Sequence, residues 1–121
     1  MWFGPDVTQT FLSRNGVRLI VRSHEGPDAR AKRPHMPDVA ATGFSEDHSG
    51  AAGKLCTLFS APRYPMVETN TDVETAVLPS TVQQPPSNRG AWLVLSPPQY
   101  HDDFRVMSFD AAPRPPATAF R

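Results

Sequence analysis

The four residues Arg22-Ser23-His24-Glu25 have the clearest capacity for chemistry in this chain, because they follow the apolar run at residues 17–21. Such a run predicts a strand buried on both faces, as in the interior of a covered sheet. Ligands of open α/β sheets bind beyond the carboxyl ends of the strands, and His24 stands at that end. Its imidazole is a candidate metal ligand, although an isolated histidine after a strand is more often a hydrogen-bonded structural residue.

The other histidines do not add a second group of metal ligands. His35 and His48 have no cysteine or histidine at ligand spacing, and His101 precedes two aspartates in a pattern that predicts a solvated turn. One imidazole alone supplies too few donors to hold a divalent ion. We therefore expect His24 to lack a metal site made by this chain alone.

Nucleophilic catalysis has little support in the sequence. A Ser-His-Asp triad can be drawn from Ser23 or Ser60 with His24 and Asp28, but the Gly-x-Ser-x-Gly turn that exposes a serine nucleophile is absent from the sequence. Cys56, the one cysteine, lies in an apolar segment without an adjacent base. This context predicts a buried, unreactive thiol.

The elements that position His24 can be predicted from local patterns. Pro5 and Asp6 suit the first turn of a helix, and Asn15-Gly16 supplies a left-handed stop. These signals predict a helix over residues 5–14 that leads into a strand over 17–23. The remaining segments are predicted as a long loop over 25–53, a strand over 55–60, a surface insertion or disordered segment over 66–88, and a hairpin of strands 91–95 and 104–109 joined by a Pro97-Pro98 turn.

The composition places the chain in a broad class. Its 121 residues match one small domain, and the 12 basic and 12 acidic side chains leave no net charge to attract nucleic acid or an anionic membrane. No segment has the roughly 18 consecutive apolar residues of a membrane span, and the start of the sequence lacks the features of a signal peptide. We expect an intracellular protein of the nucleus or cytoplasm, with no nucleic-acid or membrane partner.

Several motifs together resemble the last third of the catalytic domain of serine/threonine protein phosphatases of the phosphoprotein phosphatase family. They are Phe3-Gly4-Pro5-Asp6-Val7-Thr8, Phe11-Leu12, Arg22-Ser23-His24-Glu25-Gly26-Pro27-Asp28-Ala29-Arg30 and Leu58-Phe59-Ser60-Ala61-Pro62-Arg63-Tyr64. Three further motifs are similar to the plant type 7 branch, namely Gly26-Pro27-Asp28-Ala29-Arg30, Gly53-Lys54-Leu55 and Tyr64-Pro65. Arg63 departs from the family pattern, which usually has Asn or Asp there.

The resemblance implies an α/β fold, an incomplete calcineurin-like metallophosphoesterase β-sandwich with one helix, about four strands and long loops. It divides the chain, a C-terminal fragment of the catalytic domain on this interpretation, into a matching part at 1–66, a divergent insert with prolines at 67–88, and terminal strands and a tail at 89–121.

The resemblance also implies a chemistry. In the intact family domain two divalent metal ions, manganese or iron and zinc, activate a water that hydrolyses phosphoserine or phosphothreonine in phosphoprotein substrates. His24 matches one metal ligand, and Tyr64 matches a tyrosine over the cleft whose phenol can contact a phosphate oxygen. Most other ligands have no counterpart here, so we expect this chain to be inactive and to bind no metal stably when alone.

A noncatalytic scaffold is the alternative function. Pro97-Pro98-Gln99-Tyr100 and Pro113-Arg114-Pro115-Pro116 match short motifs that partner proteins recognise in the polyproline II conformation. Such patterns occur by chance, and the first coincides with the predicted turn between two strands. A structural role is therefore favoured over a proline-motif-binding partner.

Overall fold

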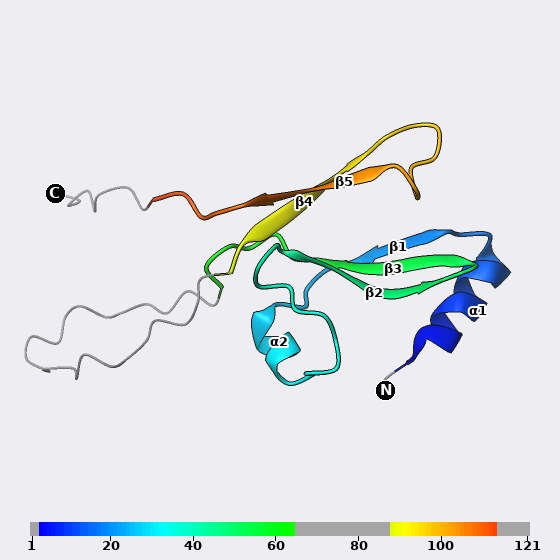
Figure 1. The fold of residues 1–121 in the computed structure, drawn as a ribbon, viewed down its shortest axis with the longest axis horizontal. Helices are drawn as coiled ribbons and strands as arrows, with labels where there is room; N and C mark the ends of the chain where they lie inside the picture. The colour runs from blue at the N-terminus through cyan, green and yellow to red at the C-terminus, as the bar shows by residue number, and fades with distance from the viewer. Residues whose placement is uncertain (1–2, 65–87, 114–121) are drawn as a thin grey trace, which may run out of the picture.

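The computed structural model describes residues 3–64 and 88–113, which form an α/β fold of two small sheets and two helices (Figure 1). The elements in chain order are α1 (Pro5–Asn15), β1 (Leu19–Arg22), α2 (Pro27–Ala31), β2 (Phe44–Gly50), β3 (Gly53–Leu58), β4 (Gly90–Leu95) and β5 (Phe104–Phe109). All of the predicted insert except Asn88 lies outside the described residues, as does the second proline motif from Arg114 onward. Neither described helix has the length and hydrophobicity to cross a membrane.

The first sheet has the strand order β1-β3-β2, with β3 parallel to β1 and antiparallel to β2. The central strand contributes most of the core, because Leu55, Cys56 and Thr57 are all buried. Both helices lie below this sheet in the view of Figure 1, and the β4–β5 hairpin lies above it. The sheet is thus the middle of three layers, as expected for an element with apolar residues on both faces.

Helix α1 confirms the prediction for residues 5–14. Pro5 occupies its first turn, and Gly16 ends it in the left-handed conformation with φ 63°. Thr8 and Leu12, one helical turn apart, are its buried residues, and the helix contacts β2 and β3.

The predicted loop over residues 25–53 is wrong, because α2 and β2 both lie within it. Helix α2 has only five residues, too few to show a helical period in the sequence. Strand β2 reads Phe-Ser-Glu-Asp-His-Ser-Gly, and its buried positions hold polar side chains such as Ser45 and Asp47. The expected alternation of apolar residues is therefore absent although the segment pairs along the whole of β3.

The prediction for β1 also needs correction. The strand spans Leu19–Arg22 and is paired with β3 on one side only, so it is an edge of the described sheet. Val17 and Val21 are 38% and 41% exposed. The run is therefore not covered on both faces by the described residues, although its apolar composition alone would fit a buried strand.

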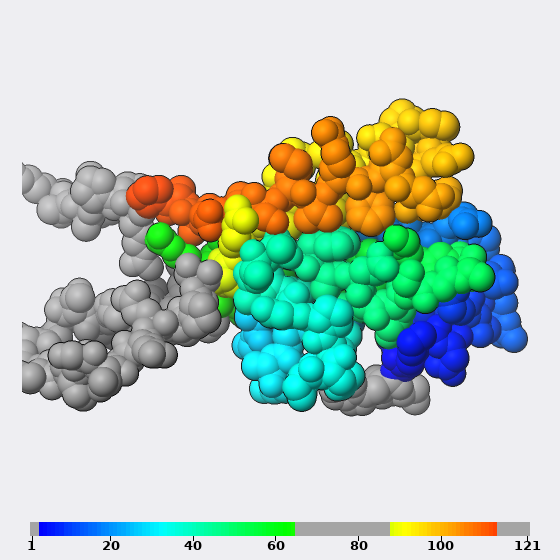
Figure 2. Space-filling model, viewed as in Figure 1, coloured from blue at the N-terminus to red at the C-terminus, as the bar shows by residue number. Residues whose placement is uncertain are grey.

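The hairpin predicted at the end of the chain is confirmed. Strands β4 and β5 are antiparallel, with Leu95 opposite Phe104, and the Ser96 amide donates to the Asp103 carbonyl to close the turn that contains Pro97-Pro98. Figure 2 shows the hairpin in yellow and orange lying along the cyan and green surface of the first sheet. The Phe44 and Phe104 rings, 6.1 Å apart, contact each other between the two sheets.

Three backbone segments meet at Gly43 and join the two sheets. The Phe59 amide donates to the Gly43 carbonyl, and the Phe59 carbonyl accepts from the Ala91 amide. Gly43 has φ 73°, and a Cβ atom there would lie 2.6 Å from the Ala91 nitrogen. Only glycine fits this junction, because both the backbone conformation and the close approach exclude a side chain.

Candidate functional site

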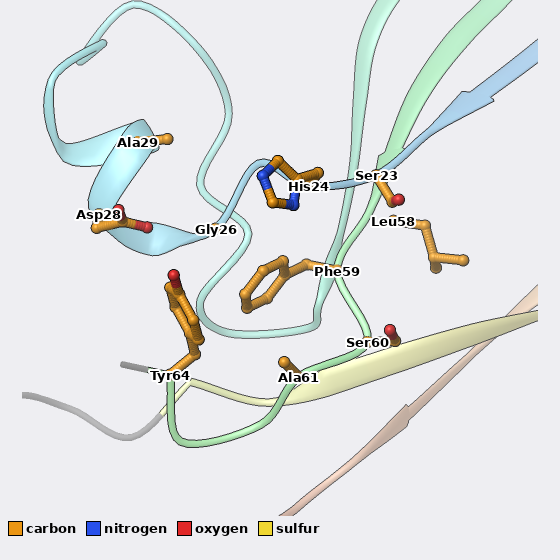
Figure 3. A pocket seen from close by; sticks show the side chains of 10 residues that line it. All are labelled: Ser23, His24, Gly26, Asp28, Ala29, Leu58, Phe59, Ser60, Ala61 and Tyr64. Atoms are coloured by element: carbon orange, nitrogen blue, oxygen red, sulfur yellow. The ribbon is translucent and has the colours of Figure 1, made fainter. Parts of the chain in front are cut away.

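His24 and Tyr64 line the same pocket of about 350 Å³, although 40 positions separate them in the sequence (Figure 3). Their proximity follows from the sheet. Strands β1 and β3 are parallel, with Arg22 opposite Thr57, so their carboxyl ends meet at one edge. His24 follows the end of β1 and Tyr64 follows the end of β3, which is the edge where open α/β sheets bind ligands.

The floor of the pocket is aromatic. Phe59 is 7% exposed, and its ring meets the Tyr64 ring edge-on with 5.4 Å between the centroids. Gly26 passes directly beside it, since a Cβ on Gly26 would lie 2.8 Å from the Phe59 ring. The missing side chain therefore lets the segment after His24 pass close to the ring.

The His24 backbone lies in the left-handed region with φ 63°, which is uncommon for a residue with a side chain. Ionic contacts fix the residues around it. Glu25, with a side chain only 8% exposed, pairs with Arg22 at 2.6 Å and with Arg33, and lies 3.6 Å from the Arg30 Nε. The network holds the end of β1 to α2, so the position of His24 is defined although its own side chain is exposed.

Asp47 is the second anion of this network, and its side chain is fully buried. Arg30 Nη2 donates to both of its oxygens at 2.9 and 3.0 Å, and Arg22 Nη2 donates to Oδ2 at 2.8 Å. The hydroxyls of Thr57 and Ser45 donate to it at 2.5 and 2.7 Å. Burial alone would raise the pKa of Asp47, but the hydrogen bonds from Arg30, Thr57, Arg22 and Ser45 outweigh burial and lower the pKa to about 2.

A β-bulge lies at Asp47 on β2. Glu46 pairs with Cys56 and His48 with Leu55, so Asp47 is the extra residue on β2. Ser45 and Asp47 are two positions apart, a spacing that places side chains on one face of a strand. Both accept hydrogen bonds from Arg30 Nη2, so β2 is joined to the helix that follows His24.

Tyr64 is positioned by Asn88, the last residue of the segment predicted as a divergent insert. Asn88 is 3% exposed. Its side-chain oxygen accepts from the Tyr64 amide at 2.6 Å, and its side-chain nitrogen donates to the Ala61 carbonyl at 2.8 Å. The Arg63 amide in turn donates to the Asn88 carbonyl at 3.0 Å. Arg63 itself has φ 56°, a conformation that suits the asparagine common in the family.

The donors at the pocket are too few for a metal centre formed by this part of the chain alone. Over residues 3–64 and 88–113 no three His, Cys, Asp or Glu side chains are grouped closely enough to hold an ion. The lining offers the His24 imidazole and the Asp28 carboxylate. His48 instead has a structural contact, because its Nδ1 lies 2.7 Å from the Thr8 hydroxyl.

The structure supports neither candidate nucleophile, the serine of a Ser-His-Asp triad or Cys56. Ser23, Ser60, His24 and Asp28 all line the pocket, yet none of the hydrogen bonds in the described part of the chain joins either serine to His24. Cys56 is fully buried, and burial raises the pKa of its thiol to about 11. The predicted burial of this cysteine is confirmed. A raised pKa leaves little of the nucleophilic thiolate near neutral pH, which agrees with the prediction of an unreactive thiol.

Comparison with known proteins identifies the class to which this architecture belongs. The chain is 39% identical over 118 residues to serine/threonine-protein phosphatase 7 of Arabidopsis thaliana, a match that covers 97% of this chain and 25% of that protein. It is 32% identical over 121 residues to the phosphatase 7 long form homolog of the same plant, covering 99% of this chain and 8% of that protein. Human serine/threonine-protein phosphatase 5 is 40% identical over 62 residues, covering 51% of this chain and 9% of that protein.

The chain therefore belongs to the serine/threonine protein phosphatases of the phosphoprotein phosphatase family. Within that class, the two phosphatase 7 relatives, which match nearly the whole chain, place it in the type 7 branch. The chain spans a quarter or less of the length of these relatives. No protein-family model and no solved structure matches it.

Proposed function

We propose that this chain forms one wall of the active-site cleft of a phosphatase that hydrolyses phosphoserine and phosphothreonine in phosphoproteins. The observation that carries the proposal is the meeting of His24 and Tyr64 at one pocket in a chain 39% identical to phosphatase 7. On this proposal the two small sheets are part of a calcineurin-like β-sandwich that further protein completes.

Within this cleft we assign two roles. His24 is one ligand of a dinuclear centre of manganese, or of iron and zinc, whose other ligands come from outside this chain. Tyr64 donates a hydrogen bond from its phenol to a phosphate oxygen. The pinning of the Tyr64 amide by Asn88 supports this assignment, because a group that must meet a phosphate has to be held in place.

The same donor count predicts that the chain alone is catalytically silent. One imidazole and one carboxylate cannot complete the four to six donors that a divalent ion requires. Purified and supplied with manganese, the chain should hydrolyse an aryl phosphate no faster than buffer. A manganese-dependent turnover that disappears in His24→Ala would show that it carries a complete site.

The decisive test of the proposed function is a chimera with the Arabidopsis thaliana phosphatase 7. This chain replaces the aligned 118 residues of that protein, and hydrolysis of a phosphoserine peptide is measured with manganese. We expect activity in the chimera, loss of about 100-fold or more in His24→Ala, and a fall in kcat in Tyr64→Phe. His101→Ala is the matched control, because His101 lies in the turn of the hairpin beside Asp102.

The outcomes separate the roles. A soluble, folded chimera that is inactive, or one in which His24→Ala and His101→Ala behave alike, contradicts the proposed function. A Tyr64→Phe variant with unchanged kcat contradicts the phosphate contact only.

A further inference from the structure

The backbone of His24 has a conformation that its own side chain does not explain. Its φ of 63° lies in the left-handed region, where a Cβ atom crowds the backbone and glycine is favoured. None of the hydrogen bonds in the described part of the chain comes from the exposed His24 side chain, so no local bond of that kind stabilises the turn. A strained conformation of this kind persists only where the surrounding structure imposes it.

The chain is fixed on both sides of His24. Before it, β1 pairs with β3 as far as Arg22. After it, Glu25 and Gly26 are both buried. Figure 3 shows His24 on the short connection between the end of β1 and Gly26. Only Ser23 and His24 therefore remain to turn the chain from the strand toward the buried positions.

The Arg22 guanidinium spans this turn. Its Nη1 lies 2.6 Å from the Glu25 carboxylate, on the other side of Ser23 and His24. Its Nη2 donates to Asp47 at 2.8 Å, and its Nε donates to the Thr57 hydroxyl at 3.0 Å. Because Asp47 lies on β2 and Thr57 on β3, the guanidinium is anchored to the sheet while it holds Glu25 back toward the end of β1.

The other cations around Glu25 do not hold the turn in this way. Arg30 and Arg33 also contact the Glu25 carboxylate, but both come from positions after His24. Their contacts fasten Glu25 to α2 and to the segment that follows it, and they do not join the two ends of the turn. Arg22 is the cation of this network that precedes His24 in the chain.

We propose that Arg22 is a positioning residue of the active site, because its guanidinium closes the turn and so holds His24 in the left-handed conformation beside the pocket. The catalytic consequence rests on the proposed function. The effect of Arg22 on the backbone of His24 does not rest on it, so the two can be tested separately.

The first test uses the chain itself, without metal or substrate. His24→Gly and His24→Ala differ only by the Cβ atom, so their thermal midpoints compare the cost of the left-handed conformation. In the chain with Arg22, His24→Gly should melt about 4 °C above His24→Ala. Arg22→Lys keeps the charge but replaces a planar fork with a single ammonium group, which cannot hold all three acceptors. When Arg22→Lys is added to both variants, the turn opens and His24→Gly should lose this advantage.

Two further variants control this comparison. Arg14→Lys makes the same exchange at an exposed position of α1 and should leave the difference of about 4 °C unchanged. Glu25→Gln removes the other partner of the pair that spans the turn and should act as Arg22→Lys does. It takes the place of Arg22→Lys if that variant does not fold.

The second test measures manganese binding and activity in the chimera. Free manganese is counted by electron paramagnetic resonance, and the concentration for half-maximal binding should rise about 10-fold in Arg22→Lys, as loss of a supporting residue typically gives. Excess manganese should restore most of kcat for the phosphoserine peptide in Arg22→Lys. Arg14→Lys should change neither the binding nor the activity.

Equal midpoints for His24→Gly and His24→Ala in the chain with Arg22, or a difference that survives both Arg22→Lys and Glu25→Gln, would overturn the assignment of Arg22. Manganese binding unchanged by Arg22→Lys in an active chimera would also contradict it. An inactive chimera, with the expected midpoints in the chain alone, would contradict the proposed function and leave the control of His24 by Arg22 supported.

Discussion

Replacing Asp47 by asparagine should destabilise the chain far more than any exposed charge change on the same strand. The carboxylate is fully buried and accepts hydrogen bonds from Arg22, Arg30, Ser45 and Thr57. Asparagine keeps the shape but turns an NH2 group toward donors. It leaves the Arg30 guanidinium, 2% exposed, with the more distant Glu25 as its anionic partner, besides the hydrogen bond to the Ser45 hydroxyl. Breaking a buried ion pair on one side typically costs 3–5 kcal/mol, so we expect a loss of about 3 kcal/mol.

The lowered pKa of Asp47 indicates a stabilisation of the same order. Asp47 titrates at about 2 in the folded chain against an ordinary value of 3.8, a difference equivalent to about 2 kcal/mol. Because the folded pKa is the lower one, this stabilisation is present above pH 3.8 and is lost as the pH falls from 3.8 through 2. Asp47→Asn should therefore flatten the decline of stability in that window.

The assay is urea unfolding followed by circular dichroism at low protein concentration, repeated from pH 7 down to pH 2. Glu46→Gln is the matched control. Glu46 precedes Asp47 on β2, but its ion pair with Lys54 is about 39% exposed and should be worth less than about 1 kcal/mol. Equal losses in the two variants, or a wild-type acid transition unchanged by Asp47→Asn, would refute the reasoning.

Two further predictions test the backbone junctions. Gly43→Ala should lower the free energy of unfolding by about 3 kcal/mol or more, because alanine there must adopt a left-handed conformation and would clash with the Ala91 backbone. Gly16→Ala should lower it by only about 1 kcal/mol, because Gly16 has φ 63° but open space around it. Similar thermal midpoints for the two variants would contradict this prediction. Asn88→Ala should lower the free energy of unfolding by about 2 kcal/mol and speed hydrogen exchange at the Tyr64 amide. Asn15→Ala, which loses only an exposed hydrogen bond to the Phe11 carbonyl, should change neither the stability nor that exchange rate.

The parts of the fold with strong local signals could be predicted from the sequence. Helix α1 has a proline at its start and a glycine at its end, and the final hairpin has two apolar runs around a proline turn, so both were predicted within a few residues. Strand β2 was missed because Asp47, like most charged residues, suggests solvent exposure, and nothing local reveals that arginines from β1 and α2 neutralise it.

In the candidate site, too, some residues are indicated by local sequence motifs and others depend on contacts between distant segments. The sequence indicates His24 and Tyr64 because each lies in a motif that resembles the family, and the parallel pairing of β1 and β3 explains why they meet. Asn88 carried no comparable signal, since its role depends on hydrogen bonds to residues more than 20 positions earlier in the chain. Positioning residues of this kind become visible only when the segments they join are seen together.

The contacts of Asn88 have a consequence for how the sequence of this chain can change. They hold the two ends of the intervening segment against each other, with the Arg63 and Tyr64 amides bonded to Asn88. Joining two fixed ends by a longer chain costs little more, because each doubling of loop length adds only about 0.6 kcal/mol in closure entropy. Insertions and deletions between Tyr64 and Asn88 can therefore accumulate without moving Tyr64, which makes this junction a permissive place for new sequence to be acquired.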